Sequence, residues 1–338
     1  MDNDFESGAT SEGGSTTSNC EADEFKNRFR LDFHLDAIID PSSGVKRIAF
    51  VLDPVRYEIR QVSNEPVVFD RLDNFIISLS AVQKMVEEAW ARIPTGQGQR
   101  LGDGRAYIAS RREVIKRDLE GAPQSQDLFV DRSEEFLEQL ADGIHGFAVL
   151  SLDLVHSTKL SAALDPLSNA RITGLVLREL AAVVPFFNGH ILKFTGDGVL
   201  AYFPTPSFLT ANDNAIDCAV TMRGLILDAL NPNLIIRGYP TLSLRIGIES
   251  GGAVATSVGH STSKLQRDLI GQTINIACKI QVSSEPNEIR IGGIAYRNMH
   301  TMWKRGCQLA GAPGGRPFSP DGTTHQIYVF SASGAILE

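Results

Sequence analysis

The sequence is poor in cysteine, and its cysteines form no pattern that indicates a disulfide framework or a metal site. The chain of 338 residues has four of them: Cys20, Cys218, Cys278 and Cys307. They are far apart, and neither a C-x-x-C pair nor the Cys/His spacing of a zinc site occurs. We therefore expect a cytoplasmic protein with reduced thiols and no zinc.

Long apolar segments and blocks of positive charge are also missing. The longest apolar stretch, residues 176–187, is interrupted by charge and falls short of the ~20 residues that span a membrane. The N-terminus lacks the basic and apolar regions of a signal peptide. The formal charge is −8 and no block of Lys and Arg offsets it, which argues against general binding to nucleic acid or to a membrane surface.

Apolar residues make up 43% of the chain, which is enough for two globular units with their connections. Residues 1–24 are rich in Ser, Gly, Thr and acidic residues, which predicts a disordered tail. Residues 25–141 show three strand-like runs, helical spacing over 72–93 and a Gly-rich connector, 95–104, that lacks the spacing of a nucleotide-binding loop. We expect a small α+β N-terminal region there, of unknown role.

Residues 143–331 form the second predicted unit. The order of its elements, β-α-ββ-α-ββ-α-β, predicts an α+β fold in which helices flank a mixed sheet. Within it, 147–155 (FAVLSLDLV) is typical of a buried strand and 190–203 (HILKFTGDGVLAYF) of a β-hairpin. The glycines of 242–259 predict two strands joined by a tight turn.

Two aspartates stand at unusual places in these elements. Asp153 lies near the end of the apolar strand, and Asp197 lies at the tip of the hairpin. Each has an ordinary explanation, because a strand-end aspartate can cap the next helix and Asp-Gly is a favoured dipeptide of hairpin turns. Together, a strand end and a neighbouring hairpin tip deliver hard oxygen ligands to one point, which suits Mg²⁺ or Mn²⁺ carrying a phosphate.

Four motifs in register carry a resemblance to a known family. They are FAVLSLDLVHST (147–158), LKFTGDGVLAYF (192–203), LRIGIESGGAV (244–254) and RDLIGQTINIACKI (267–280). In this order and spacing they resemble the catalytic domain of the class III nucleotide cyclases, over about residues 143–331. The resemblance implies a metal-dependent enzyme that forms a 3′,5′-cyclic nucleotide and pyrophosphate from a nucleoside triphosphate. It also implies that Asp153, Asp197 and the backbone carbonyl of Leu154 hold two Mg²⁺ or Mn²⁺ ions.

The same resemblance assigns the residues that bind the substrate. Lys193 and Asp268 match the pair that reads the base, Asn275 matches the residue that orients the ribose, and Lys279 matches the residue that meets the phosphate in the transition state. The family usually has Arg at the last position, and lysine lacks the planar bidentate fork, so slower or differently tuned chemistry is expected. Family members are head-to-tail dimers. This implies a homodimer with sites at the interface, the metal aspartates coming from one subunit and the other four residues from its partner.

The identity of the base stays open at this point. Lysine and aspartate suit adenine, but cytosine shows the same adjacent acceptor and amine, and uracil has an N–H between carbonyls that the pair also satisfies. The compact chain resembles the bacterial pyrimidine cyclases of Pycsar antiphage systems. We therefore lean toward UTP or CTP as substrate, cyclic UMP or cyclic CMP as product, and a downstream cyclic-nucleotide-binding effector. The alternative is an adenylate cyclase that makes cyclic AMP from ATP for signalling.

A further alternative is a degenerate cyclase-like domain that binds a nucleotide or a partner without turnover. The late lysine that binds the triphosphate in many relatives has no clear counterpart, and Lys304, Arg305 and Arg316 are the candidates. This gap and the lysine at position 279 motivate the non-catalytic alternative, whereas the intact metal aspartates and Asn275 oppose it.

Overall fold

The structure, a computed structural model, describes these parts of the chain: 33–39, 46–52, 54, 56–71, 74–84, 104–121, 132–140, 142–155, 157–204, 208–259, 266–310 and 325–331. The predicted disordered tail, residues 1–24, and nearly all of the Gly-rich connector lie outside the described residues. No helix within the described ranges is both long and apolar enough to span a membrane.

Two small antiparallel sheets come first in the described part of the chain. Their strands are β1 (Phe33–Ile39) with β2 (Lys46–Leu52), and β3 (Tyr57–Val62) with β4 (Glu65–Asp70) and β5 (Phe75–Ser78). The helix predicted over 72–93 is wrong in its first part, because residues 75–78 pair with β4 and helical structure begins at 79. Backbone pairing with a neighbouring strand here overrides a local helical pattern.

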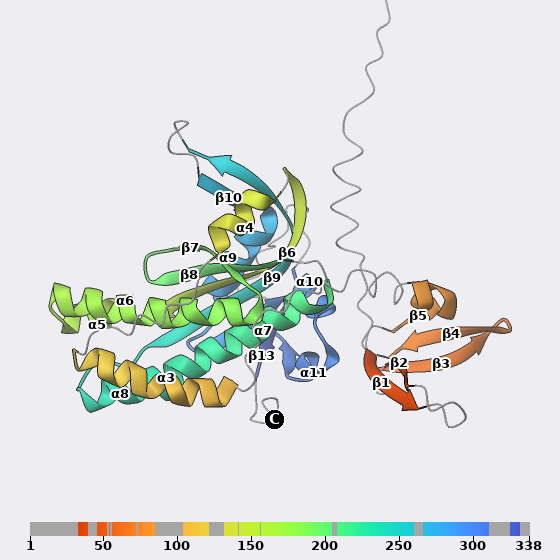
Figure 1. Cartoon of the computed structure of the whole chain (residues 1–338), viewed down its shortest axis with the longest axis horizontal. Coiled ribbons are helices and arrows are strands. Elements are labelled where there is room, and N and C mark those ends of the chain that lie inside the picture. The colour runs from red at the N-terminus through yellow and green to blue at the C-terminus, as the bar shows by residue number, and fades with distance from the viewer. Residues whose placement is uncertain are drawn as a thin grey trace, which may run out of the picture.

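One mixed sheet forms the centre of the second unit (Figure 1). Its strands are β6 (Gly143–Val155), β7 (His190–Phe194), β8 (Gly198–Pro204), β9 (Ser243–Val258), β10 (Gln266–Ile270), β11 (Glu288–Gly292), β12 (Cys307–Leu309) and β13 (Ile327–Phe330). They are ordered β12-β13-β11-β9-β6-β8-β7, with β10 paired to β9. Strands β9 and β11 run parallel, and the other pairs are antiparallel. The predicted α+β fold with a mixed sheet is confirmed.

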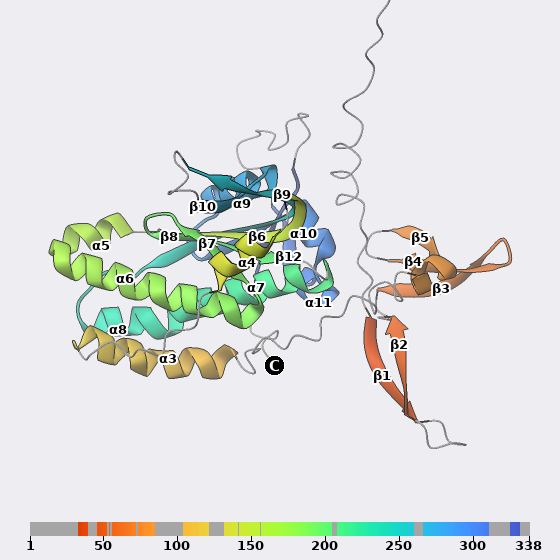
Figure 2. The same ribbon diagram turned by 45° about the horizontal axis from the view of Figure 1, so that its top comes forward.

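Helices cover both faces of this sheet (Figures 1 and 2). The larger layer contains α3 (Gly104–Leu119), α6 (Pro166–Val183), α7 (Phe208–Gly224), the π-helical segment η2 (Leu225–Leu230) and α8 (Asn231–Ile236). The opposite face carries α4 (Ser133–Gln139) and α9 (Gln272–Ser283). The remaining short helices are α5 (Ser157–Ala163), η1 (Val184–Phe187), α10 (Gly293–Asn298) and α11 (Thr301–Lys304).

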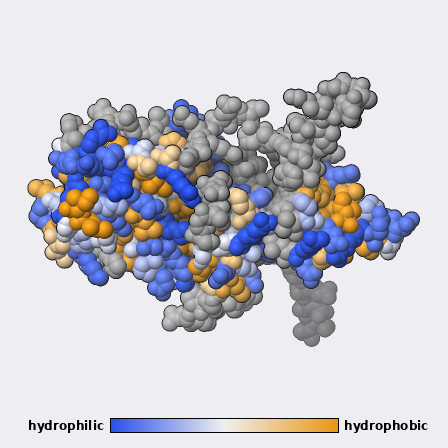
Figure 3. Space-filling model, turned by 90° about the horizontal axis from the view of Figure 1, so that it is seen from below, coloured by the Kyte–Doolittle hydropathy of each residue, from blue (hydrophilic) through white to orange (hydrophobic). Residues whose placement is uncertain are grey.

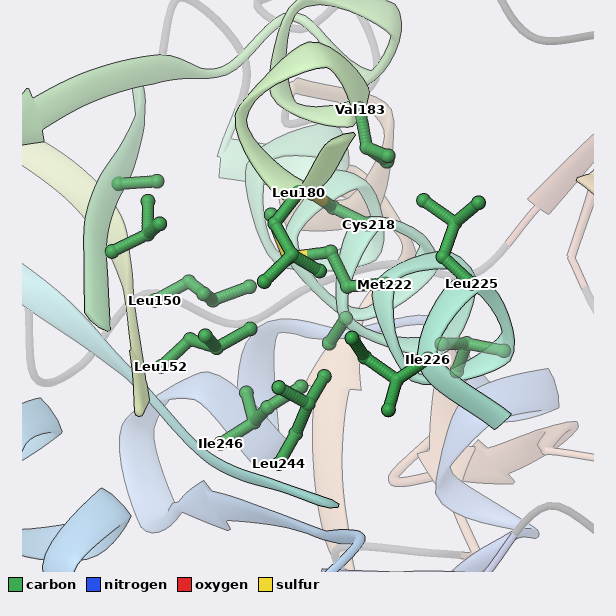
Figure 4. Packing of buried hydrophobic residues seen from close by; sticks show 14 of the residues in the cluster. Leu150, Leu152, Leu180, Val183, Cys218, Met222, Leu225, Ile226, Leu244 and Ile246 are labelled. Carbon is green, nitrogen blue, oxygen red and sulfur yellow. The ribbon is translucent and has the colours of Figure 1, made fainter. Parts of the chain in front are cut away.

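Strand β6 shows why the sheet has a core on each face. Its even-numbered residues, among them Leu150 and Leu152, pack with Met222 in the larger core (Figure 4). Its odd-numbered residues Phe147 and Val149 belong to the second core, with α4 and α9. Successive side chains of a strand point to opposite faces, so an uninterrupted apolar run is buried on both.

Strand β9 corrects the prediction for residues 242–259. The sequence indicated two strands and a glycine turn, but the structure has one continuous strand of 16 residues. A Cβ at Gly247 would overlap backbone atoms of Ala277 and Gln281 in α9, and a Cβ at Gly251 would overlap the side chain of Thr273. These glycines therefore allow the close approach of a helix, which is the second common reason for glycine in a strand.

Two helices that precede the predicted boundary near residue 142 pack against the catalytic sheet. Helix α3 contributes Ile108 and Ile115 to the larger core, and α4 contributes Leu137 to the second core. The division into residues 25–141 and 143–331 stays a prediction. The described end of the first range nevertheless shares its buried surface with the second range.

Ion pairs fasten helix α3 to α6. Arg111 donates two hydrogen bonds of 2.8 Å to the carboxylate of Glu179, and Arg178 pairs with Asp118. Seen from the side that carries α3 and α8, the described surface is largely hydrophilic, with separate apolar patches (Figure 3). Helix α3 therefore belongs to the outer helical layer, with its apolar stripe turned inward.

Candidate active site

The alternation of β6 sets the direction of Asp153. Its neighbours Leu152 and Leu154 are buried in the larger core, so Asp153 faces the opposite side of the sheet, where its side chain is 33% exposed. Leu154 is the next-to-last residue of β6 and pairs with Leu244 of β9. Because the side chain of Leu154 is buried, its backbone carbonyl is the group that fits the predicted role of metal ligand.

Asp197 lies at the tip of the β7–β8 hairpin, beside the end of β6. The N–H of Thr195 donates to the carbonyl of Gly198 at 3.0 Å, and Gly196 has φ +77°, a conformation that favours glycine. Gly198 in turn pairs with Asp153 in the register of β6 and β8. The structure thereby brings the carboxyl group of Asp197 close enough to Asp153 to raise the pKa of the Asp153 carboxyl.

The two carboxyl groups concentrate negative charge that their surroundings do not balance. Burial raises the pKa of the Asp153 carboxyl, and the charge and hydrogen bond of Asp197 raise it further, whereas Arg245 lowers it. A divalent cation relieves this repulsion, and hard oxygen donors with open positions fit Mg²⁺ or Mn²⁺. Within the described ranges, no cluster of three or more His, Cys, Asp and Glu side chains offers a competing metal site.

Arg245 is a residue of this site that the sequence reasoning missed. It lies on β9 directly opposite Asp153 in the strand register, with its Nη2 4.0 Å from the Asp153 Oδ2. Its Nε is buried and has no hydrogen-bond partner within the described part of the chain. A lone arginine inside the apolar run LRIGI was the available signal, because a charge in a core strand calls for a specific partner.

The predicted base-reading pair forms a second polar cluster. Lys193 of β7 and Asp268 of β10 are brought together, with the lysine Nζ 2.6 Å from the Asp268 Oδ2. The other carboxylate oxygen of Asp268 accepts a hydrogen bond from the N–H of Leu269 at 2.8 Å. The two side chains are 44% and 23% exposed, so a ligand can reach them.

Helix α9 presents its two predicted site residues to solvent. Asn275 and Lys279 are exposed and one helical turn apart, whereas Ala277 and Ile280 between and beside them are buried. The charged groups that act on the pKa of Asp153 are Asp197 and Arg245, and not those of this helix. Within one chain, the aspartate pair is therefore one polar group, and the predicted substrate-binding residues Asn275 and Lys279 are not part of it.

Comparison with known proteins identifies the family and the fold of this domain. Residues 142–309 match the family model described as the adenylate and guanylate cyclase catalytic domain. This chain contains a class III nucleotide cyclase catalytic domain. The fold of the cyclase domain is also that of the adenylyl cyclase CyaB from P. aeruginosa, with a TM-score of 0.51 and 23% identity over 59% of this chain and 100% of that chain.

Curated relatives of the cyclase domain include bacterial proteins. An adenylate cyclase of Anabaena cylindrica is 28% identical over 154 residues, which is 44% of this chain and 29% of the relative. Adenylate cyclase 1 of Rhizobium meliloti is 29% identical over 130 residues, which is 38% of this chain and 19% of the relative. This chain thus spans less than a third of the length of these relatives.

Lys304, Arg305 and Arg316 are the candidates for a residue that binds the triphosphate near the C-terminal end of the domain. Lys304 is 4% exposed, and its Nζ donates to the carbonyl of Arg297 at 2.9 Å, which makes it a structural residue of α11 and rules it out as a candidate. Arg305 is exposed. Arg316 lies outside the described residues.

Proposed function

We propose that this chain is a metal-dependent nucleotide cyclase, which converts a nucleoside triphosphate into a 3′,5′-cyclic nucleotide and pyrophosphate. The observation that carries the proposal is the convergence of Asp153, near the end of β6, and Asp197, at the tip of the β7–β8 hairpin, with Arg245 beside Asp153. Two carboxylates whose charge is incompletely balanced suit a site that gains divalent cations together with a polyphosphate.

Each residue of this cluster has a distinct part in the proposed reaction, in which the ribose 3′-oxygen bonds to the α-phosphorus and pyrophosphate leaves. Asp153, Asp197 and the carbonyl of Leu154 hold the cations. When bound, two Mg²⁺ or Mn²⁺ ions would lower the pKa of the 3′-hydroxyl and neutralise charge on the phosphates. Arg245 is placed to donate to a phosphate oxygen, because its side chain is 32% exposed and its Nη2 lies 4.0 Å from the Asp153 Oδ2.

The complete site is proposed to form between two copies of this chain. One chain supplies the aspartate cluster, and the second supplies Lys193, Asp268, Asn275 and Lys279. Apolar side chains near the second cluster support an interface there, since Phe194 on β7, Ile270 on β10 and Val282 on α9 are 51%, 55% and 67% exposed. A head-to-tail homodimer would bury these side chains and complete two equivalent sites.

Two substrate classes fit the Lys193–Asp268 pair. The lysine can donate to a ring nitrogen while the aspartate accepts from the neighbouring amine, which suits adenine and cytosine alike. The adenylate cyclase names of the relatives favour ATP. Lys279 stands where the family usually has arginine, and this difference favours the pyrimidine alternative, in which cyclic UMP or cyclic CMP activates an effector in antiphage defence.

Turnover of the four common triphosphates tests both the cyclase activity and the choice of base. The purified chain is incubated with Mn²⁺ or Mg²⁺ and each triphosphate separately, and the products are identified by mass spectrometry. We expect a cyclic nucleotide and pyrophosphate from at least one of them and none after chelation of the metal. Product from ATP alone would reject the pyrimidine and antiphage reading. Nucleotide binding without any product would replace the cyclase proposal by the non-catalytic one.

A further inference from the structure

Helix α4 lies between the two strands that carry the base-reading pair. Figure 1 shows this short helix beside β10 and β7, before the chain enters β6. Lys193 is on β7 and Asp268 is on β10, and they are far apart in the sequence. The position of one side chain relative to the other therefore depends on what holds the two strands together.

Arg267, the residue before Asp268, fixes β10 to the C-terminal end of α4. Its Nε donates to the carbonyl of Leu137 at 3.3 Å, and its Nη2 donates to the carbonyl of Leu140 at 2.7 Å. Its Nη1 donates to the carboxylate of Asp142 at 3.0 Å. Carbonyls at a helix end lack their usual partners four residues on, and that of Leu137 accepts otherwise from the N–H of Leu140 at 3.3 Å, so a charged donor satisfies them well. The Arg267 side chain is 19% exposed, whereas that of Asp142 is 89% exposed, so the two carbonyl contacts carry most of the attachment.

The N-terminal part of α4 contacts β7 through a hydrogen bond and a ring stack. The N–H of Ile191 donates to the Oγ of Ser133 at 2.8 Å, and the ring of Phe136 stacks on His190 with 4.3 Å between centroids. Both contacts fall within three residues of Lys193. Helix α4 thus contacts one strand at each end.

An apolar contact joins the two attachments. Leu137 of α4 belongs to the same buried cluster as Leu192 and Leu269. Leu192 directly precedes Lys193, and Leu269 directly follows Asp268. The buried neighbours of both base-reading residues therefore pack in one cluster with the same side chain of α4.

We propose that Arg267 is a positioning residue for base selection, which sets the position of the Asp268 carboxylate relative to Lys193 through helix α4. This inference rests on the proposed cyclase function. The backbone of β10 pairs with β9, and the Lys193–Asp268 ion pair, whose lysine is 44% exposed, contributes too little to fix β10 relative to β7 by itself. Hydrogen bonds from a guanidinium to helix-end carbonyls are stronger and directional, and a lysine cannot reproduce their fork.

A matched arginine on the other side of the sheet provides the control. Arg237 is also 19% exposed and also joins two elements, since it donates to the carbonyls of Asn233 in α8 at 2.9 Å and of Lys116 in α3 at 3.2 Å. It lies in the layer that contains α3 and α8, away from the base-reading pair. Arg237→Ala therefore reports the general cost of removing a bridging arginine.

The experiment compares base discrimination in the full chain carrying Arg267→Ala, Arg267→Lys or Arg237→Ala. Binding of non-cyclisable α,β-methylene analogues of the preferred and the least preferred triphosphate is measured, together with kcat and KM. We expect Arg267→Ala to reduce discrimination about tenfold, the equivalent of one misplaced hydrogen bond to the base, and to act on KM more than on kcat. Arg267→Lys should keep part of the discrimination, and Arg237→Ala all of it.

Three other results have clear consequences. Wild-type discrimination in both Arg267 variants would overturn the inference and leave the cyclase proposal intact. An equal loss in Arg237→Ala would also overturn it, because the effect would then be one of general destabilisation. A wild-type chain that neither binds nor cyclises any triphosphate would reject the proposed function itself. If Arg267→Ala fails to fold, Arg267→Lys decides.

Discussion

The two charged pairs of the cyclase domain differ in every respect that affects function. Asp153 and Asp197 carry the same charge and are partly buried, and burial together with Asp197 raises the pKa of the Asp153 carboxyl. Lys193 and Asp268 carry opposite charges and neutralise each other, and only the lysine is more exposed than Asp153. As the proposed metal site, the first pair needs a cation to balance its charge. As the proposed base-reading pair, the second is already neutralised and must open to accept a base.

The supports of the two pairs differ as well. The aspartates are held by the register of β6 and β8, which are central, long-paired strands. The lysine and the aspartate of the second pair lie on β7, at the end of the sheet order, and on β10, which pairs with β9 alone. The aspartate pair is thus held by the sheet itself, whereas the proposed base-reading pair depends also on contacts of its two strands with helix α4. The following predictions test this contrast.

Asp197→Asn should have the largest effect. Loss of a metal ligand should lower activity by about a thousandfold or more, because cations supply several kcal/mol of transition-state stabilisation. The same change should raise the free energy of unfolding without metal by about 0.5–1 kcal/mol, since a like charge is removed. Asp228→Asn, a change at an exposed carboxylate of η2, is the control for both measurements. A stability loss on Asp197→Asn would contradict the idea of a strained like-charged pair.

Mixed dimers should recover much of this loss if the two clusters come from different chains. Asp197→Asn and Asn275→Ala are each expected to be nearly inactive. A mixture of the two should regain about a quarter of wild-type activity, because half of the dimers are mixed and each has one intact site. Activity is measured after unfolding and refolding the variants together, with separately refolded variants as the control. A mixture no more active than its components would show that each chain builds its own site.

Lys193→Ala should act on binding and leave stability nearly unchanged. We expect KM to rise about 10- to 100-fold, the equivalent of one or two hydrogen bonds to a charged donor, with a smaller change in kcat. The free energy of unfolding should change by less than about 1 kcal/mol, because the ion pair is exposed. Arg60→Ala, which removes a similarly exposed ion pair with Glu58, should change neither KM nor kcat. A Lys193→Ala variant with unaltered KM would remove the base-reading assignment.

A third charged pair, His325 and Glu249, includes a fully buried carboxylate. His325 contacts Glu249, which also accepts hydrogen bonds from the N–H groups of Ser250 at 2.8 Å and Ala295 at 3.0 Å. Burial opposes the charge on His325, but the hydrogen bond and charge of Glu249 outweigh it and raise the pKa of His325, against a smaller opposing effect of Arg297. The pair therefore stabilises the fold fully below the ordinary pKa of 6.5, and this contribution is lost as pH rises through the raised folded value.

His325→Gln should accordingly cost more stability in acid than in base. We expect a loss of about 1–3 kcal/mol at about pH 6, because a buried carboxylate loses a charged partner, and a smaller loss at about pH 9. Denaturant unfolding at the two pH values measures the difference. Equal losses at both would mean that the imidazole is neutral in the folded chain.

Local patterns predicted some elements of the fold well and others poorly. The apolar run 147–155 and the hairpin at 190–203 were predicted because alternation and turn chemistry are local signals. Strand β5 was misassigned and the glycines of β9 were misread, because strand pairing and the approach of α9 involve residues distant in the sequence. Arg245 was missed for the same reason, since its significance comes from Asp153 on the adjacent strand.

By itself, the sequence determined the cyclase fold and supplied the residues that are predicted to hold a cation or read a base. It did so because residue types and their spacing are local properties of the chain. Only the tertiary structure decided which of these residues meet: Asp153 with Asp197, Lys193 with Asp268, and Arg267 with the end of α4. Strand register and helix packing bring together groups that no local pattern connects, and register is set by the burial of the whole sheet.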